Sequence, residues 1–123
     1  MTTTFVCGLC GVARDELIGR SKLIVNINQF DRSKIFEIVR VSYLLANRKA
    51  VVADVDPDTD VDPDIRSAVK VSTSAELVQD CVSLAADDTA RRALEESGFA
   101  AMQKRDIRPI LQQALAASPP TPW

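Results

Sequence analysis

One segment of the chain, residues 21–54, constrains the fold most, because its polarity changes in the order expected of a β-α-β unit. Lys22–Ile27 (KLIVNI) is apolar and partly β-branched, which is typical of a strand buried on both faces of a parallel sheet. After the polar stretch Asn28–Lys34, Ile35–Ala46 is apolar on nearly all sides, as in a helix packed on a sheet. Ala50–Ala53 (AVVA) predicts the next strand. The segment therefore predicts an α/β fold with a right-handed helical crossover.

A single carboxylate, Glu37, lies near the start of the predicted helix. Nucleotide sites of α/β proteins form where a strand, a loop and a helix start face a cleft, and an acidic residue there accepts hydrogen bonds from sugar hydroxyls. Two other roles also explain the position. A carboxylate near a helix N-terminus favours the helix dipole by ~0.3–1 kcal/mol, and Glu37 can pair with Arg40. No glycine-rich dinucleotide motif or P-loop is present, so these alternatives stay open.

Composition excludes several classes of function. The 123 residues fit one domain, and the net charge of −2 gives no field that would attract nucleic acid or anionic lipid. No apolar run approaches the ~20 residues that span a bilayer, and no secretion signal is visible. We therefore expect no membrane span, no nucleic-acid partner and a cytoplasmic location. The chain has no histidine, which removes the commonest general base and most catalytic zinc sites.

Shorter patterns predict the remaining elements. We expect short strands at Phe5–Leu9 and Val69–Val71 and a helix at Ala13–Arg20. Towards the C-terminus, a capping box at residues 73–76 and an acidic cap at residue 87 or 88 predict two helices, and Gly98 predicts a break or bend. Further helical pieces are expected at residues 99–105 and 107–115.

These elements define the expected fold class. Residues 1–117 are predicted to form a single α/β domain, with a small Rossmann-like, mostly parallel sheet flanked by helices and a helical C-terminal section. Residues 118–123 (SPPTPW) are predicted to be a flexible tail.

Two motifs resemble metal or redox sites, and the simpler interpretation is favoured for each. Cys7 and Cys10 have the C-x-x-C-G form of a zinc knuckle, but only Cys81 remains to complete the set of four ligands. Small buried hydrophobic residues are therefore the favoured interpretation of the cysteines. Residues 54–64 hold six aspartates at alternate positions but lack the glycine and glutamate of an EF-hand loop, which favours a solvated loop.

The block SKLIVNINQ followed by IFEIVRVSYLLANRKAVVAD resembles the donor-binding domain of GT-B glycosyltransferases of the group 1 type. In that family a strand precedes a helix that carries a glutamate, and a second apolar strand follows. The tail SAELVQDCVSLAADDTARRALEESGFAAM resembles the helices that end such domains. The similarity runs over residues 14–110. The family has two α/β domains with the substrates between them, and the resemblance covers the later part of one.

The resemblance implies a donor-binding site at the carboxyl end of the first strand. Glu37 matches the glutamate that binds the ribose of a nucleotide-sugar donor, and the backbone N–H groups around residues 33–36 would face the pyrophosphate. Asn28 and Gln29 stand where the family usually has histidine and glutamate; they keep hydrogen bonding but lose the titratable or charged group. The candidate substrate-binding residues are Glu37, Asn28, Gln29, Ser33, Lys34 and Phe36, with no catalytic residue and no metal ligand.

Two functions from different classes follow from this reasoning. The first is a glycosyltransferase-like domain with a residual nucleotide-sugar site, which is inactive alone, uses no cofactor and takes the nucleotide sugar as its ligand. The second is a non-catalytic interaction module that pairs with a second protein chain, or with its own copies, through an open sheet edge.

Overall fold

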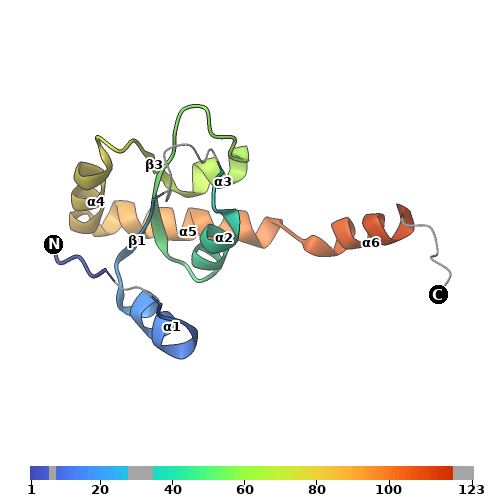
Figure 1. Cartoon of the computed structure of the whole chain (residues 1–123), viewed down its shortest axis with the longest axis horizontal. Coiled ribbons are helices and arrows are strands. Elements are labelled where there is room, and N and C mark those ends of the chain that lie inside the picture. Colours follow the sequence, from blue (N-terminus) through green and yellow to red (C-terminus); the bar gives the residue numbers. More distant parts are fainter. Residues whose placement is uncertain (6–7, 28–34, 118–123) are drawn as a thin grey trace.

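The structure is a computed structural model that describes residues 1–5, 8–27 and 35–117 (Figure 1). The described residues form three strands and six helices. In chain order these are α1 (Gly11–Arg20), β1 (Leu23–Asn26), α2 (Ile38–Ala46), β2 (Ala50–Asp54), α3 (Pro63–Ala68), β3 (Lys70–Ser72), α4 (Leu77–Ala86), α5 (Asp88–Lys104) and α6 (Ile107–Ala117).

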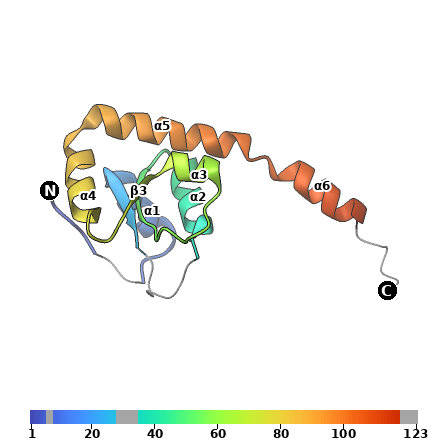
Figure 2. The same ribbon diagram turned by 90° about the horizontal axis from the view of Figure 1, so that it is seen from above.

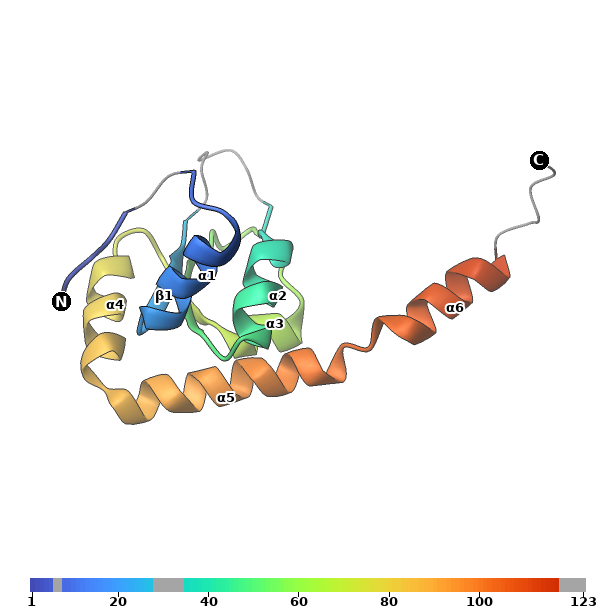
Figure 3. The same cartoon turned by 90° about the horizontal axis from the view of Figure 1, so that it is seen from below.

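The strands form one parallel sheet in the order β1-β2-β3. Val25 is paired with Val52, and Ala53 is paired with Val71, so β2 lies in the centre. Helix α4 covers one side of the sheet, and α2 and α3 lie on the other (Figures 2 and 3). This arrangement confirms the predicted α/β class with a small, Rossmann-like parallel sheet.

The core lies between β2 and the helices on one face of the sheet. Val41, Leu44 and Leu45 form the buried side of α2, and Ile65 and Ala68 are fully buried in α3. These side chains belong to one cluster of buried residues that also includes β2 residues such as Val51. Packing against the sheet and α5 thus explains one side of the predicted helix. Ile35 and Val39 are 73% and 84% exposed, so the expectation of a segment covered on nearly all sides is wrong.

Helix α5 crosses the end of the domain without a break, which corrects the expectation at Gly98. Gly98 lies beside Leu45 and Ala68, near the last residues of α2 and α3. A Cβ atom at residue 98 would lie 2.7 Å from Leu45 Cδ2 and 3.3 Å from the Ala68 carbonyl oxygen. The glycine therefore permits the close approach of α5 to two helices, and the predicted break at this residue is wrong.

Helix α5 lies at the amino-terminal end of the strands, opposite their carboxyl ends. The crossover helices run opposite to the parallel strands that they connect, so the ends of α2 and α3 mark the starts of the strands. Because α5 packs against those helix ends, it lies next to the starts of the strands. Helix α2 begins at the opposite end of the sheet, where the strands end (Figure 2).

Three further expectations are corrected by the structure. The described residues of Phe5–Leu9 form no strand; Phe5 is 92% exposed, and Gly8 has a positive φ of 74°. The aspartate-rich stretch is not all loop, since Pro63 at the first position begins helix α3. Strand β1 is only half-buried rather than covered on both faces, because it lies at the edge of the sheet.

One of the two predicted helix caps is confirmed, and the other is wrong. The Asp87 side chain accepts a hydrogen bond from the Ala90 N–H at 2.9 Å and caps α5. In the predicted capping box, the Thr73 hydroxyl donates to the Glu76 carboxylate at 2.9 Å, and α4 begins one residue later, at Leu77. The box residues therefore form the turn that leads into α4 rather than its first turn.

Helix α6 extends beyond the rest of the molecule in all three views (Figures 1, 2 and 3). All of its residues are exposed. In the part of the chain that the structure describes, no helix has the length and apolar character needed to cross a bilayer.

Candidate functional site

The candidate site lies at the carboxyl edge of the sheet, where β1, β2 and β3 end at Asn26, Asp54 and Ser72. In open parallel α/β sheets this edge is where ligands bind, because helix N-termini gather there. Helix α2 begins at this edge.

Glu37 lies immediately before α2 and not inside it. Its backbone has φ −79° and ψ 66°, and the Ile38 N–H donates to the Phe36 carbonyl at 2.8 Å, which together define an inverse γ-turn. The helix therefore begins at Ile38 rather than at the predicted Ile35. The cause is a contact with a distant part of the chain, since the backbone of Ile35 is occupied in a parallel bridge with Asp60.

The Glu37 carboxylate is paired with Arg40 and does not cap the helix. One Glu37 oxygen forms an ion pair with the Arg40 guanidinium, and the side chain makes no hydrogen bond to the first-turn N–H groups. About a third of the Glu37 side chain and half of the Arg40 side chain are exposed. The pairing that the sequence left open is thus present, and both charges remain reachable from solvent.

Asn26 is a third member of this cluster, and it was not among the predicted site residues. It is fully buried at the end of β1, and its Oδ1 accepts a hydrogen bond from Arg40 Nη1 at 3.4 Å. Its Nδ2 has no hydrogen-bond partner among the described residues. A buried amide with an unused donor is costly unless another group accepts from it. The available sequence signal was a polar residue that ends an apolar strand.

We refer to Asn26, Glu37 and Arg40 as the edge cluster. It joins a buried amide donor, a carboxylate acceptor and a guanidinium at the start of a helix. Such a set can accept hydrogen bonds from hydroxyl groups through Glu37 and donate to phosphate oxygens through Arg40.

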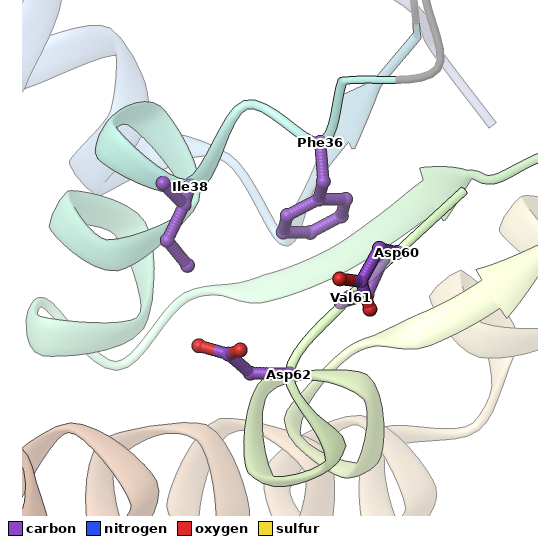
Figure 4. A pocket seen from close by; sticks show the side chains of 5 residues that line it. All are labelled: Phe36, Ile38, Asp60, Val61 and Asp62. Atoms are coloured by element: carbon purple, nitrogen blue, oxygen red, sulfur yellow. The ribbon is translucent and has the colours of Figure 1, made fainter.

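Phe36 forms part of a small pocket next to the edge cluster. The pocket is lined by Phe36 and Ile38 on one side and by Asp60, Val61 and Asp62 on the other (Figure 4). Its volume is about 160 Å³, whereas sites for drug-sized ligands measure roughly 300–1,000 Å³. The pocket therefore suits one ring of a ligand. Its two carboxylates, of which Asp62 is paired with Arg105, favour hydroxyl groups over phosphate.

Four of the predicted site residues, Asn28, Gln29, Ser33 and Lys34, lie outside the described residues. Of the predicted set, the structure describes Glu37 and Phe36. These two are neighbours in sequence, with Glu37 in the edge cluster and Phe36 lining the pocket.

The aspartate-rich loop is held by protein groups at several points. Arg105 pairs with Asp62 and Asp64 at 2.6 Å, and this guanidinium lowers the pKa of Asp64 to about 2. The Ser74 hydroxyl donates to Asp54 at 2.9 Å. Among the described residues, no group of three or more acidic, cysteine or histidine side chains is arranged to hold a metal ion.

The cysteines described by the structure are separate. Cys81 is buried as expected, whereas Cys10 is exposed, so the interpretation as a buried hydrophobic residue is wrong for Cys10; neither forms a disulfide. Burial raises the pKa of the Cys81 thiol, as expected for a small hydrophobic residue in a core. Cys7, the other half of the C-x-x-C motif, lies outside the described residues.

Comparison with protein-family models, with curated proteins and with solved structures found no match to this chain.

Proposed function

We propose that the carboxyl edge of this sheet is a residual nucleotide-sugar site in a glycosyltransferase-like domain. The observation that carries the proposal is the edge cluster itself. Glu37, the residue that the resemblance assigns to ribose binding, lies at the start of α2 beside Arg40 and the unused donor of Asn26.

In the proposed complex, each group of the edge cluster meets a different part of the ligand. The Glu37 carboxylate accepts hydrogen bonds from the two ribose hydroxyls. Arg40 turns from Glu37 towards the diphosphate, to which a guanidinium donates two parallel hydrogen bonds. The first turn of α2 adds N–H groups that have no acceptor within the helix.

The neighbouring pocket would hold a sugar or base ring rather than phosphate. The Phe36 ring offers an apolar face, and Asp60 and Asp62 can accept hydrogen bonds from ring hydroxyls. Because the pocket is small and acidic, the diphosphate is assigned to the side of α2 that carries Arg40.

The proposal is limited to binding. The chain has no histidine to act as a general base, and GT-B enzymes place the acceptor on a second domain. We therefore assign no transfer reaction to this domain alone.

A titration followed by amide chemical shifts tests the proposal. UDP-, GDP- and ADP-glucose at millimolar concentration should shift the amide signals of Asn26 and Glu37–Arg40 for at least one of the three. Glu37→Gln should weaken binding about tenfold or more, since two charge-assisted hydrogen bonds are replaced by neutral ones.

Glu16→Gln, the same change on the exposed surface of α1, is the matched control and should bind as the unmodified protein does. The proposal fails if none of the three donors shifts signals near residues 28–40, or if the two glutamine variants bind equally well.

A second candidate function rests on the exposure of strand β1. Leu23, Ile24 and Val25 are half-buried, and among the described residues β1 is paired with β2 alone. The strand contains no proline and no charge, which are the features that usually protect an edge. We infer that this edge can accept a strand from another chain.

Hydrogen exchange tests the edge pairing separately from nucleotide binding. If a second copy adds to β1, the protection of amides in Leu23–Asn26 should rise with protein concentration. Equal exchange at all concentrations would exclude pairing between copies at this edge.

A further inference from the structure

Helix α6 carries an apolar stripe that the rest of the described chain leaves exposed. The stripe, which we call the α6 stripe, consists of Ile107, Ile110, Leu111 and Leu115. Their spacing of three and four residues places them on one side of the helix, and their exposed fractions are 51–75%. Exposed aliphatic side chains grouped in this way indicate an interaction surface.

The position of α6 makes the stripe accessible. Arg105, just after α5, is held by Asp62 and Asp64 at the start of α3, which anchors the base of α6 to the domain. From there the helix extends away from the sheet and its covering helices (Figure 3). A partner can therefore approach the stripe without meeting the body of the molecule.

The low charge of α6 indicates which kind of partner would bind the stripe. Arg108 is the only charged residue in Ile107–Ala117, and its guanidinium is paired with Asp106 at 2.7 Å. Helices that lie on membrane surfaces are rich in lysine and arginine on their polar face. A neutral aliphatic stripe fits a second neutral aliphatic stripe, and a second copy of the chain supplies one.

The buried area is sufficient for a weak dimer. A large aliphatic side chain contributes on the order of 100 Å² of apolar surface when fully covered. Two stripes of four therefore supply at most about 800 Å², below the ~1,000 Å² of specific interfaces and in the range of weak contacts. We therefore expect a dimer that forms at micromolar or higher concentration rather than a permanent one.

We propose that α6 pairs with α6 of a second copy in an antiparallel two-helix contact. Antiparallel pairing opposes the two helix dipoles and places the two Arg108 side chains at opposite ends. Leu111, midway between Ile107 and Leu115, then faces its own counterpart at the centre. This contact depends neither on nucleotide binding nor on the β1 edge.

Sedimentation equilibrium from about 10 µM to 1 mM tests the pairing. The unmodified chain should show a monomer–dimer equilibrium, and Leu111→Glu should weaken it by tenfold or more. Gln112→Glu adds the same charge outside the stripe and should leave the equilibrium unchanged. Leu111 is half-exposed, so its replacement should not unfold the domain, which circular dichroism checks.

Several results would overturn the proposal. They are a monomer at every concentration, equal effects of the two glutamate variants, and a monomer that instead binds vesicles of anionic lipid through α6.

Crosslinking tests the orientation. In a chain with Cys7→Ser and Cys10→Ser, Leu111→Cys should form a disulfide between copies faster than Leu115→Cys under the same mild oxidant. An antiparallel pair brings the two residues 111 together and separates the two residues 115. Faster crosslinking through residue 115 would contradict the antiparallel arrangement.

Discussion

Gly98 and Gly19 both lie in helices, but their surroundings differ. A Cβ atom at residue 98 would meet Leu45, whereas one at residue 19 would meet nothing within 4 Å. At residue scale, Gly98 shows why a glycine in a helical pattern is ambiguous: the sequence favours a break, and the structure uses the missing side chain for close packing.

Gly98→Ala should therefore destabilise the domain although alanine favours helices. Overpacking a well-packed core costs about 1–3 kcal/mol, and the gain in helix propensity is at most ~1 kcal/mol. Because Leu45 is fully buried and has little room to move, we expect a net loss of about 1 kcal/mol in the free energy of unfolding.

Gly19→Ala in α1 is the matched control and should raise the free energy of unfolding by about 0.5–1 kcal/mol. Denaturant unfolding of both variants measures the difference. Equal stabilisation by the two substitutions would contradict the packing assigned to Gly98.

At the scale of elements, the sequence predicts the strands and the interior of the helices better than their ends. The order and apolar pattern of residues 22–53 correctly predict β1, α2 and β2. The start of α2 is wrong by three residues, because the bridge between Ile35 and Asp60 is a contact between distant parts of the chain. Helix α3 is hidden by the alternating aspartates, which pattern reasoning assigns to a loop.

In the candidate site, too, the sequence predicts local features but not those that depend on contacts between distant parts of the chain. Glu37 could be found from its place before an apolar helix, and its pairing with Arg40 from their spacing. The role of Asn26 could not be predicted from the sequence, because its burial and its unused donor depend on where the strand lies in the sheet.

The contact between α3 and the end of α5 should depend on pH. Arg105 lowers the pKa of Asp64 from 3.8 to about 2. The folded state therefore binds this proton more weakly than the unfolded state does. The resulting stabilisation is fully present above about pH 4 and is lost as the pH falls through about 2.

Arg105→Gln should thus lower the melting temperature at pH 6, and its difference from the unmodified chain should shrink between pH 4 and pH 2. Arg108→Gln removes an ion pair within exposed α6 and should change the melting temperature little at either pH. A difference for Arg105→Gln that stays constant down to pH 2 would show that the Asp64 pair is not its cause.

At the scale of the whole molecule, the two ends of the sheet differ in character. Helix α5 closes the amino-terminal end and buries the core, while the carboxyl end carries exposed charge and the small pocket. Helix α6 adds a surface for association that lies apart from both. The described part of the domain thus has a proposed binding site at the carboxyl ends of the strands, an opposite end closed by α5, and a projecting helix.

The most direct measurement for the proposed nucleotide site is a double-mutant cycle between Glu37 and the ribose hydroxyls. The nucleoside diphosphate that binds best is compared with its 2′,3′-dideoxy analogue, each against the unmodified chain and Glu37→Gln, by calorimetry. If Glu37 accepts hydrogen bonds from the hydroxyls, the analogue should bind the unmodified chain about tenfold more weakly. Glu37→Gln should reduce this discrimination, because its amide oxygen forms weaker, neutral hydrogen bonds. Equal loss of affinity for the analogue in both proteins would contradict the role assigned to Glu37.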